Sequence, residues 1–366
     1  MTNGNFLSAN YPGGNYPDRI YLDWAATAPL DPAAIAAMTV AAAAWANPSS
    51  VHAAGRAAAV RLADARRDVA SALGVNAASV VFTGGGTEAL GLALAQAETH
   101  LISAVEHDAV RAQVPRAGVI PVDPDGVIDL AALDELLRDT VRPLVAVMHV
   151  NNETGVIQPV AEVAARVTAA GGQLLIDAVQ SAGKLPLPNA DFVAVSAHKL
   201  GGPPGVGALI VRDAVTPLVR GGGQERGQRA GTENVLGIAA FAAALTARVA
   251  DGGWADRAAA LRARLEAQLP GALIHGARAP RMGTIACIGL PGVAAMTQLM
   301  ALDLAGFGVS AGAACSSGKV RTSHVLAAMG VAAPGEAIRV SLGWTTTAAE
   351  IDAFAAAWRA MAARLG

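Results

Sequence analysis

The chain has 366 residues, of which 53% are hydrophobic and 15% charged, and its formal net charge at pH 7 is −2. A chain of this length and apolar content can bury a large core and is not disordered. Its charge is close to zero and lacks blocks of one sign, which argues against a nucleic-acid partner. No run of about 20 strongly apolar residues is free of charge, so we expect no membrane span.

The first predicted element is a leader over residues 1–18, rich in Asn, Gly, Tyr and Pro. It lacks the basic start and apolar centre of a signal peptide, so we expect it to be loosely ordered and the protein to be cytoplasmic. The first helix is predicted to begin at Asp31-Pro32, because an N-cap aspartate followed by a first-turn proline is a helix start signal. We expect this helix to continue through Trp45.

Short apolar strands then alternate with helical stretches such as Glu88–Ala97 and Val160–Ala169. Continuous apolar runs are typical of strands that are covered on both faces. Their alternation with helices predicts an α/β fold with a mostly parallel sheet. The predicted strands are Ser79–Phe82, Leu101–Val105, Leu144–Val150, Leu174–Ile176, Phe192–Val195 and Ala208–Val211.

A long alanine-rich helix from Asn234 to about Val249 is predicted to lead into a second domain. We therefore expect a large domain over residues 19–250 and a smaller α+β domain over residues 251–366. The elements predicted in the small domain are helices Trp254–Leu269 and Ala348–Leu365 and strands near Thr284–Gly289 and Ile338–Ser341.

Reactive side chains follow several predicted strands at their carboxyl ends, where open α/β sheets bind ligands. The glycine loop Gly84–Thr87 follows one strand and opens a helix, which suits a phosphate. His107, Asp177 and the Ser196–Lys199 cluster follow other strands. Each alone has an ordinary explanation, such as a turn, a helix cap or a solvated lysine. Together they supply what pyridoxal phosphate requires: a phosphate cradle, a flat partner for the ring, a carboxylate for the ring nitrogen and an amine.

A dinucleotide site is the alternative from another reaction class. The Gly84–Ala89 segment fits the glycine fingerprint of such sites, and Glu106 follows the next strand. This alternative leaves Asp177 and Lys199 without a role, and its strand lies well inside the chain.

The two cysteines are too few for a disulfide framework or a metal site built on cysteines, and we expect no metal. Cys287 lies in the apolar stretch Thr284–Ile288, which predicts a small buried side chain. Cys315 lies in Ser310–Gly318, a segment of small residues that is typical of a mobile connection. Its thiol is therefore a candidate nucleophile.

These motifs resemble the cysteine desulfurases of the class V aminotransferase group, the nitrogen-fixation and iron–sulfur-cluster type with the longer cysteine loop. The likeness extends from Tyr21 to Asp352, and its most specific part is Gly223–Gly227 followed by Arg229–Asn234. The other matching motifs are Asn47–His52, Asn151–Pro159, Asp177–Gln180, Ser196–Lys199 and Ile338–Gly343.

The resemblance implies the type I fold of pyridoxal-phosphate transferases, with a seven-stranded sheet, and the conversion of L-cysteine to L-alanine. It implies that Lys199 holds pyridoxal 5'-phosphate, that His107 stacks on the ring and handles a thiol proton, and that Cys315 takes the sulfur as a persulfide. Asn152 and Arg339 are implied to bind the substrate carboxylate. The other implied cofactor contacts are Gly86, Thr87, His107, Asn152, Asp177 at the ring nitrogen, Gln180 at the ring oxygen, Ser196, His198 and Thr232.

The resemblance also implies a homodimer with composite active sites, in which Thr232 reaches across to the partner subunit, and a protein that accepts the sulfur. Another class V enzyme, namely a selenocysteine lyase, transaminase or epimerase, is the same-fold alternative, and Cys315 argues against the last two. A scaffold without activity is a third alternative, disfavoured because Lys199 and Cys315 are both present. The chain departs from the usual family pattern at Trp24, Gly84, Leu90-Gly91 and Ala313.

Overall fold

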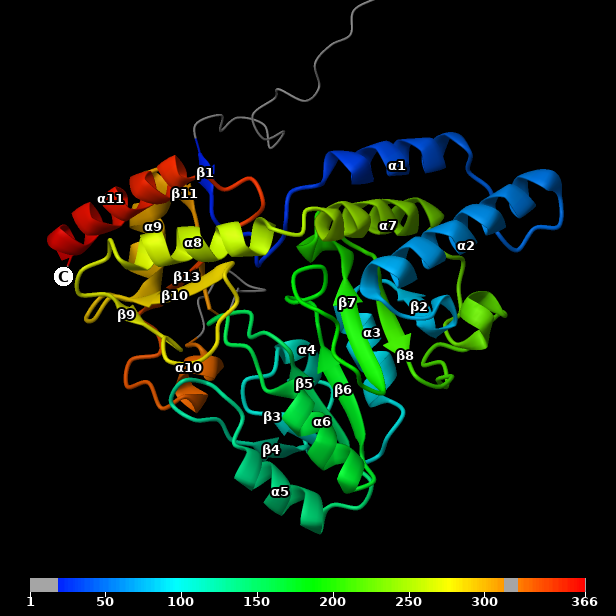
Figure 1. Ribbon diagram of the computed structural model, residues 1–366, viewed down its shortest axis with the longest axis horizontal. Coiled ribbons are helices and arrows are strands. Elements are labelled where there is room, and N and C mark those ends of the chain that lie inside the picture. The colour runs from blue at the N-terminus through cyan, green and yellow to red at the C-terminus, as the bar shows by residue number, and fades with distance from the viewer. Residues whose placement is uncertain (1–18, 313–321, 366) are drawn as a thin grey trace, which may run out of the picture.

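The computed structural model describes residues 19–312 and 322–365. The described chain forms a seven-stranded sheet, a four-stranded sheet and a two-stranded ribbon, with helices packed around them (Figure 1). The predicted leader and Cys315 lie outside the described residues, and so does Ala313.

The seven-stranded sheet has the strand order β2-β8-β7-β6-β5-β3-β4. Strand β8 is antiparallel to both of its neighbours, and every other pairing in this sheet is parallel. This confirms the predicted α/β fold with a mostly parallel sheet. The strands are β2 (Val80–Thr83), β3 (His100–Ser103), β4 (Gly118–Ile120), β5 (Leu144–Met148), β6 (Gln173–Asp177), β7 (Phe192–Ser196) and β8 (Gly207–Val211).

Apolar side chains cover both faces of this sheet, as the continuous apolar runs predict. In β5, Val145 and Val147 pack on one face, whereas Leu144 and Ala146 pack on the other. Alternate residues of a strand point to opposite faces, so a strand between two helix layers needs apolar residues throughout. The first face is covered by α2 (Ala53–Leu73), α5 (Leu130–Asp139), α6 (Val160–Ala169) and α7 (Val235–Ala250), and the second by α3 (Gly86–Leu94).

The helix predicted to begin at Asp31-Pro32 is present as α1 (Pro32–Ala43), and the Asp31 carboxylate accepts a hydrogen bond from the Ala33 N–H. It ends two residues before the predicted end at Trp45. The following helix α2 has 21 residues and was not predicted. Its buried positions include Ala58, Leu62, Ala65, Val69 and Leu73, spaced by three and four residues. This is the periodicity of an amphipathic helix, so the signal was present in the sequence.

The second sheet has the order β12-β13-β10-β9, and its pairings are antiparallel. Its strands are β9 (Leu273–Ile274), β10 (Ile285–Gly289), β12 (Ser310–Ala311) and β13 (Ala337–Ser341). Side chains of this sheet share a core with α8 (Trp254–Glu266), α9 (Ala295–Leu304) and α11 (Ala348–Leu365). The helices and strands predicted after residue 251 are thus present, while the division of the chain at residue 250 stays a prediction.

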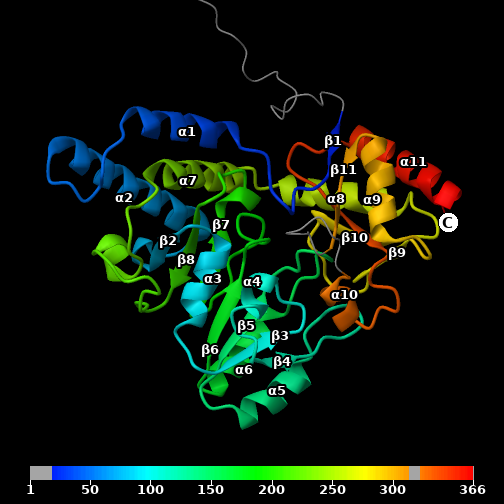
Figure 2. The same cartoon turned by 180° about the vertical axis from the view of Figure 1, so that it is seen from behind.

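The first described strand lies beside the second sheet. Strand β1 (Ile20–Tyr21) pairs in parallel with β11 (Phe307–Gly308), as both views show (Figures 1 and 2). Leu22 is fully buried in the core of the second sheet. The chain then passes along the junction of the two sheets before α1 begins, so residues 23–28, here called the strap, lie between the two parts of the molecule.

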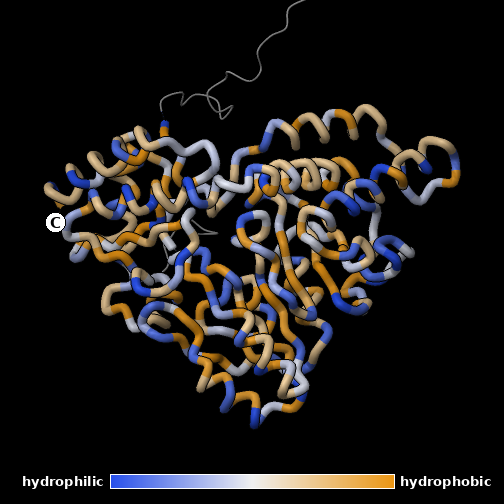
Figure 3. The backbone as a smooth tube through the Cα atoms, in the orientation of Figure 1, coloured by the Kyte–Doolittle hydropathy of each residue, from blue (hydrophilic) through white to orange (hydrophobic). Residues whose placement is uncertain are grey.

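The central strands are continuous apolar segments in the hydropathy view (Figure 3). Within the described ranges, no single helix is long and apolar enough to span a membrane. Helices α7 and α8 pass that test only as a pair, and they meet at a bend of 71°.

Candidate functional site

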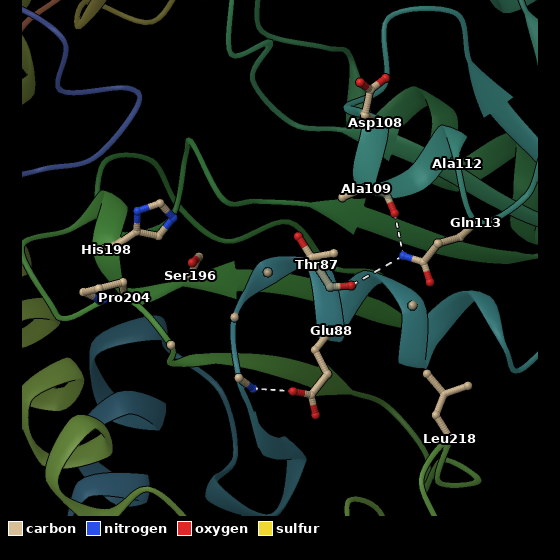
Figure 4. A pocket seen from close by; sticks show the side chains of 15 residues that line it. Thr87, Glu88, Asp108, Ala109, Ala112, Gln113, Ser196, His198, Pro204 and Leu218 are labelled. Carbon is tan, nitrogen blue, oxygen red and sulfur yellow. Dashed lines mark hydrogen bonds between the residues drawn. The ribbon is translucent and has the colours of Figure 1, made fainter. Parts of the chain in front are cut away.

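A pocket of about 640 Å³ lies at the carboxyl ends of β2 and β7. Four of the residues predicted to bind phosphate line it: Gly86, Thr87, Ser196 and His198. Ser196 and His198 lie on one side of Thr87, and Asp108 and Gln113 lie on the other (Figure 4). The structure therefore brings together residues that are separated by more than a hundred positions in the sequence.

The glycine loop is shaped for close approach. Gly85 has a φ of 148°, a value that favours glycine, and it precedes the first turn of α3. A Cβ at Gly86 would lie 2.7 Å from Val179 Cγ2, so a side chain here would collide with the turn after β6. No side chain in the described ranges caps α3. Its first N–H groups are thus available to a phosphate oxygen.

Glu88 and Arg229 form a contact that the sequence did not predict. Glu88 accepts a hydrogen bond from the Gly84 N–H at 2.7 Å (Figure 4) and one from Arg229 Nε at 2.8 Å. Burial on its own raises the pKa of Glu88, but the bonds from Arg229 and Gly84 lower it overall. A charged carboxylate therefore fastens the glycine loop to the Arg229–Asn234 motif.

The preceding motif, Gly223–Gly227, is fixed by a buried ion pair. The Glu225 carboxylate accepts hydrogen bonds from both Nη atoms of Arg66 at 2.7 Å and from the Phe82 N–H at 2.9 Å. Glu225 and Arg226 have φ values of 47° and 58°, which non-glycine residues rarely adopt. These side chains hold an unfavourable turn against β2.

Asp177 ends β6 and is buried, with 8% of its surface exposed. Its Oδ1 accepts the Val179 N–H at 2.8 Å. Burial raises the pKa of Asp177, while this hydrogen bond and the positive charges of His107 and Lys199 act in the opposite direction. The carboxylate is therefore prepared to receive a cationic partner.

Glu106 lies behind Asp177 and is fully buried. Its Oε1 accepts the Met148 N–H at 2.6 Å, and Oε2 has no partner among the described residues. Burial raises its pKa well above the usual range, and the Asp177 charge adds to this effect. A fully buried carboxyl cannot accept hydrogen bonds from the ribose hydroxyls of a dinucleotide. Glu106 therefore cannot play the role that a dinucleotide site would require of it.

His107 is exposed and caps the short helix α4 (Asp108–Arg111). Its Nδ1 accepts the Ala109 N–H at 3.0 Å. Neutral His107 therefore carries its proton on Nε2, an assignment that follows from the hydrogen bond. The ring is accessible and has a defined tautomer, as a stacking partner and proton carrier requires.

Lys199 follows β7 in a turn of 3-10 helix, and its Nζ donates to the carbonyl oxygens of Ala25 and Ala26 at 2.7 and 2.6 Å. Burial lowers the pKa of Lys199 to about 8. The positive charge of Arg339 also lowers this pKa, whereas the negative charges of Asp23 and Asp177 raise it. A substantial neutral fraction of this amine is therefore present near pH 8.

Two other predicted residues also contact the strap. Gln180 Nε2 donates to the Ala25 carbonyl at 2.9 Å, while its buried Oε1 has no partner in the described part of the chain. His198 Nδ1 lies 3.2 Å from Thr27 Oγ1. Burial lowers the pKa of His198 to about 4, with the Lys199 charge adding to the effect, so this side chain is neutral at pH 7. The strap thus holds three side chains of the site.

Arg339 lies in β13 and has 2% of its surface exposed. Its Nη1 donates to the backbone carbonyl of Asn152 at 2.9 Å, and its Nη2 donates to Asp23 Oδ1 at 2.8 Å. Its buried Nε has no partner in the described ranges. The two residues predicted to bind a carboxylate are thus in contact.

Trp24, one of the departures from the family pattern, packs at the junction of the two sheets. Its ring lies edge-on against Trp344 with the centroids 4.7 Å apart, and Trp254 also packs edge-on against Trp344 with the centroids 6.0 Å apart. A Cβ at Gly343 would lie 2.1 Å from the Trp24 ring, so the glycine makes room for the indole. The three indoles and Lys199 line one small cavity.

Thr232 is exposed and does not line the phosphate pocket. Cys287 is buried in β10 among apolar side chains, as predicted, and burial raises the pKa of its thiol far above the usual range. Such a thiol is unreactive. In residues 19–312 and 322–365, no group of three or more His, Cys, Asp or Glu side chains is placed to hold a metal ion.

The model of the family described as "Aminotransferase class-V" matches residues 20–354. The chain belongs to this family. Its members are in general pyridoxal-phosphate-dependent enzymes. The sheet order and pairings described above agree with the α/β type I fold of this family.

Similar proteins cover nearly the whole chain. A cysteine desulfurase of Cereibacter sphaeroides is 43% identical over 92% of this chain and 93% of its own length. An IscS-like cysteine desulfurase of Mycobacterium tuberculosis is 39% identical over 91% of this chain and 93% of its own. The crystal structure of a NifS-like protein from Rickettsia africae superposes with a TM-score of 0.87 at 33% identity, covering 94% of this chain and 99% of that one.

Proposed function

We propose that the protein is a pyridoxal-phosphate-dependent cysteine desulfurase, which converts L-cysteine to L-alanine and carries the sulfur on Cys315 as a persulfide. The observation that carries the proposal is the arrangement at the ends of β6 and β7. There a buried carboxylate, Asp177, and an amine with a lowered pKa, Lys199, lie near a glycine loop that is open to phosphate.

The residues present fit the cofactor. The buried Oε1 of Gln180 has no partner among the described residues, which is unusual for a buried polar atom and indicates a missing ligand. A side chain at Gly86 would fill the cradle. The buried carboxylate of Asp177 meets the need of a protonated ring nitrogen.

In this proposal the phosphate is held by Gly86, Thr87, Ser196 and His198, which all line the pocket. The remaining cofactor contacts are proposed for His107 on the ring face, Asp177 at the ring nitrogen, Gln180 at the ring oxygen, Asn152, and Lys199 as the point of covalent attachment. When bound, the cofactor supplies an electron sink for bond breaking at the substrate α-carbon.

The protein side chains perform the remaining chemistry. Arg339 and Asn152 bind the substrate carboxylate and fix its orientation. Lys199 moves a proton at the α-carbon, for which a pKa of about 8 is suited, since it exchanges readily near neutral pH. His107 accepts a thiol proton. The Cys315 thiolate then attacks the substrate sulfur; the carbon–sulfur bond breaks, its electron pair stays with carbon, and protonation of that carbon yields alanine.

The direct test incubates the purified protein with L-cysteine and cofactor and measures alanine, sulfide released by a reductant, and protein-bound sulfur. We expect alanine and sulfur in equal amounts. 3-Mercaptopyruvate formed by amino transfer, without sulfur release, would instead indicate a transaminase.

Asp177→Asn should lower alanine formation at least about 100-fold while the protein still folds and binds some cofactor. A neutral amide cannot keep the ring nitrogen protonated, although it can still accept the Val179 N–H. The measurement is the rate of alanine formation together with the amount of bound cofactor. A variant with cofactor bound and a normal rate would contradict the role proposed for Asp177.

We also expect a homodimer in which the site is completed by the partner subunit. Thr232 is exposed and lies outside the pocket of its own chain, although Arg229 of the same motif reaches the glycine loop. Thr232→Ala should weaken cofactor binding by at least about tenfold, the effect of one hydrogen bond to a charged phosphate. Sedimentation should show a dimer, and a monomer that stays fully active at high dilution would contradict this expectation.

The sulfur-acceptor protein, the use of the sulfur for iron–sulfur clusters and a cytoplasmic location belong to the same proposal. They follow from the resemblance of the cysteine segment and of the Arg229–Asn234 motif to the desulfurase group. Transfer of labelled sulfur from Cys315 to a scaffold or carrier protein would identify the acceptor.

A further inference from the structure

Arg339 already has a carboxylate partner from its own chain. Asp23 Oδ1 accepts from Arg339 Nη2 at 2.8 Å, and the Asn152 carbonyl accepts from Nη1. A substrate carboxylate must therefore bind to a guanidinium whose charge is partly offset. This differs from an unpaired arginine, which would hold any carboxylate more tightly.

The backbone around Asp23 is fixed against the strand that carries Arg339. Asp23 forms a β-bridge with Ser341, and the Ser341 N–H donates to the Leu22 carbonyl at 2.7 Å. The Tyr21 hydroxyl donates to the Asp23 carbonyl at 3.0 Å. The Asp23 side chain has 19% of its surface exposed and that of Arg339 only 3%, so the acidic member of the pair is the more accessible of the two.

Asp23 also acts on Lys199. The charged groups that set the pKa of Lys199 are Arg339, which lowers it, and Asp23 and Asp177, which raise it. Two further basic groups, Lys184 and His198, lie close enough for the charge of Lys199 to lower their own pKa values. Among these groups Asp23 is the negative charge that contacts Arg339 directly.

We propose that Asp23 is a positioning residue that aligns the Arg339 guanidinium and offsets its charge, so that the site holds a substrate carboxylate loosely enough to release the product. The inference rests on the proposed function, in which Arg339 binds that carboxylate. Its physical basis is that Asp23 fixes Nη2 of Arg339 through a hydrogen bond, and that its negative charge repels a second carboxylate beside it.

The test compares two ligands on the cofactor-loaded protein. L-alanine has a carboxylate, whereas L-alaninamide does not, and both are titrated by the change in cofactor absorbance. In Asp23→Asn, the amide oxygen still accepts from Arg339 but the negative charge is gone. L-alanine should bind about tenfold more tightly than to the parent, and L-alaninamide should bind equally well to both. The proposal would be overturned if the affinities for the two ligands changed equally, or if L-alanine bound no more tightly to the variant than to the parent.

A second measurement uses protein stripped of cofactor. The pH at which an acylating reagent modifies half of Lys199, read by peptide mass spectrometry, should be lower in Asp23→Asn than in the parent, because a negative charge that favours the ammonium has been removed. An unchanged midpoint would also overturn the proposal. If this variant fails to fold, Asp23→Ser is measured in its place, with the same direction expected.

The matched control is Asp31→Asn, which removes the charge of another buried acid that pairs with an arginine, Arg248, at 2.7 Å. It should leave both the ratio of the two ligand affinities and the Lys199 midpoint unchanged. Neither readout requires turnover. A protein that releases no sulfur from L-cysteine but shows both Asp23 effects would contradict the proposed function and support the inference.

Discussion

Lys199→Ala should abolish covalent attachment of the cofactor and lower alanine formation from L-cysteine by more than about 10³-fold. In the proposed mechanism the variant loses both the amine that attaches the cofactor and the group that moves a proton at the substrate. Borohydride reduction of the parent protein, followed by peptide mapping, should place the cofactor mass on the peptide that contains Lys199. The variant should carry none.

Lys184 is the matched control for this prediction. It is a second lysine whose pKa is lowered by burial, to about 7, and the Lys199 charge contributes to that shift. It follows the Asp177–Gln180 turn rather than β7, so we expect Lys184→Ala to keep the covalent cofactor. Cofactor found on Lys184 of the parent protein would contradict the assignment of Lys199.

Cys315→Ser should remove the persulfide and lower alanine formation at least about 100-fold, while cofactor binding stays intact. A serine hydroxyl is a far weaker nucleophile toward sulfur than a thiolate. This prediction rests on the sequence and on the resemblance, because Cys315 lies outside the described residues. The spectral change of the cofactor on addition of L-cysteine should persist, because it precedes sulfur transfer.

Cys287→Ala is the control for Cys315→Ser. Cys287 is buried among Val105, Val325 and Leu326, so the change should lower the free energy of unfolding by about 1 kcal/mol and leave turnover close to that of the parent. Mass spectrometry after a single turnover should find one added sulfur on the Cys315 peptide. An added sulfur on Cys287 would exclude Cys315 as the acceptor.

The central sheet was predictable because its strands are continuous apolar runs. The start of α1 was predictable because Asp31-Pro32 is a local start signal. The convergence of Asp177 and Lys199 was predictable for a related reason: parallel strands place their carboxyl ends at one edge of the sheet. Strand β4 was missed because three residues are too few for a periodic pattern. Helix α2 was missed although its apolar spacing is regular.

The contacts that complete the site could not be predicted. Asp23 and Arg339 are 316 residues apart, and Glu88 and Arg229 are 141 apart. An ion pair of this kind leaves no local pattern, because each member alone looks like an ordinary surface charge. The contacts of Lys199 with the Ala25 and Ala26 carbonyls are equally hidden, since a backbone acceptor has no side-chain signature.

The tryptophan cluster at the junction has an optical consequence. Trp24, Trp254 and Trp344 share a small cavity with Lys199, whereas Trp45 is exposed on the surface. Pyridoxal phosphate absorbs in the range where indoles emit, so a cofactor attached to Lys199, as proposed, would accept excitation energy from this cluster. We therefore expect the intrinsic fluorescence of the protein to fall in proportion to cofactor occupancy. Trp24, at a position where the family often has a polar or aromatic residue, is part of this built-in reporter of loading.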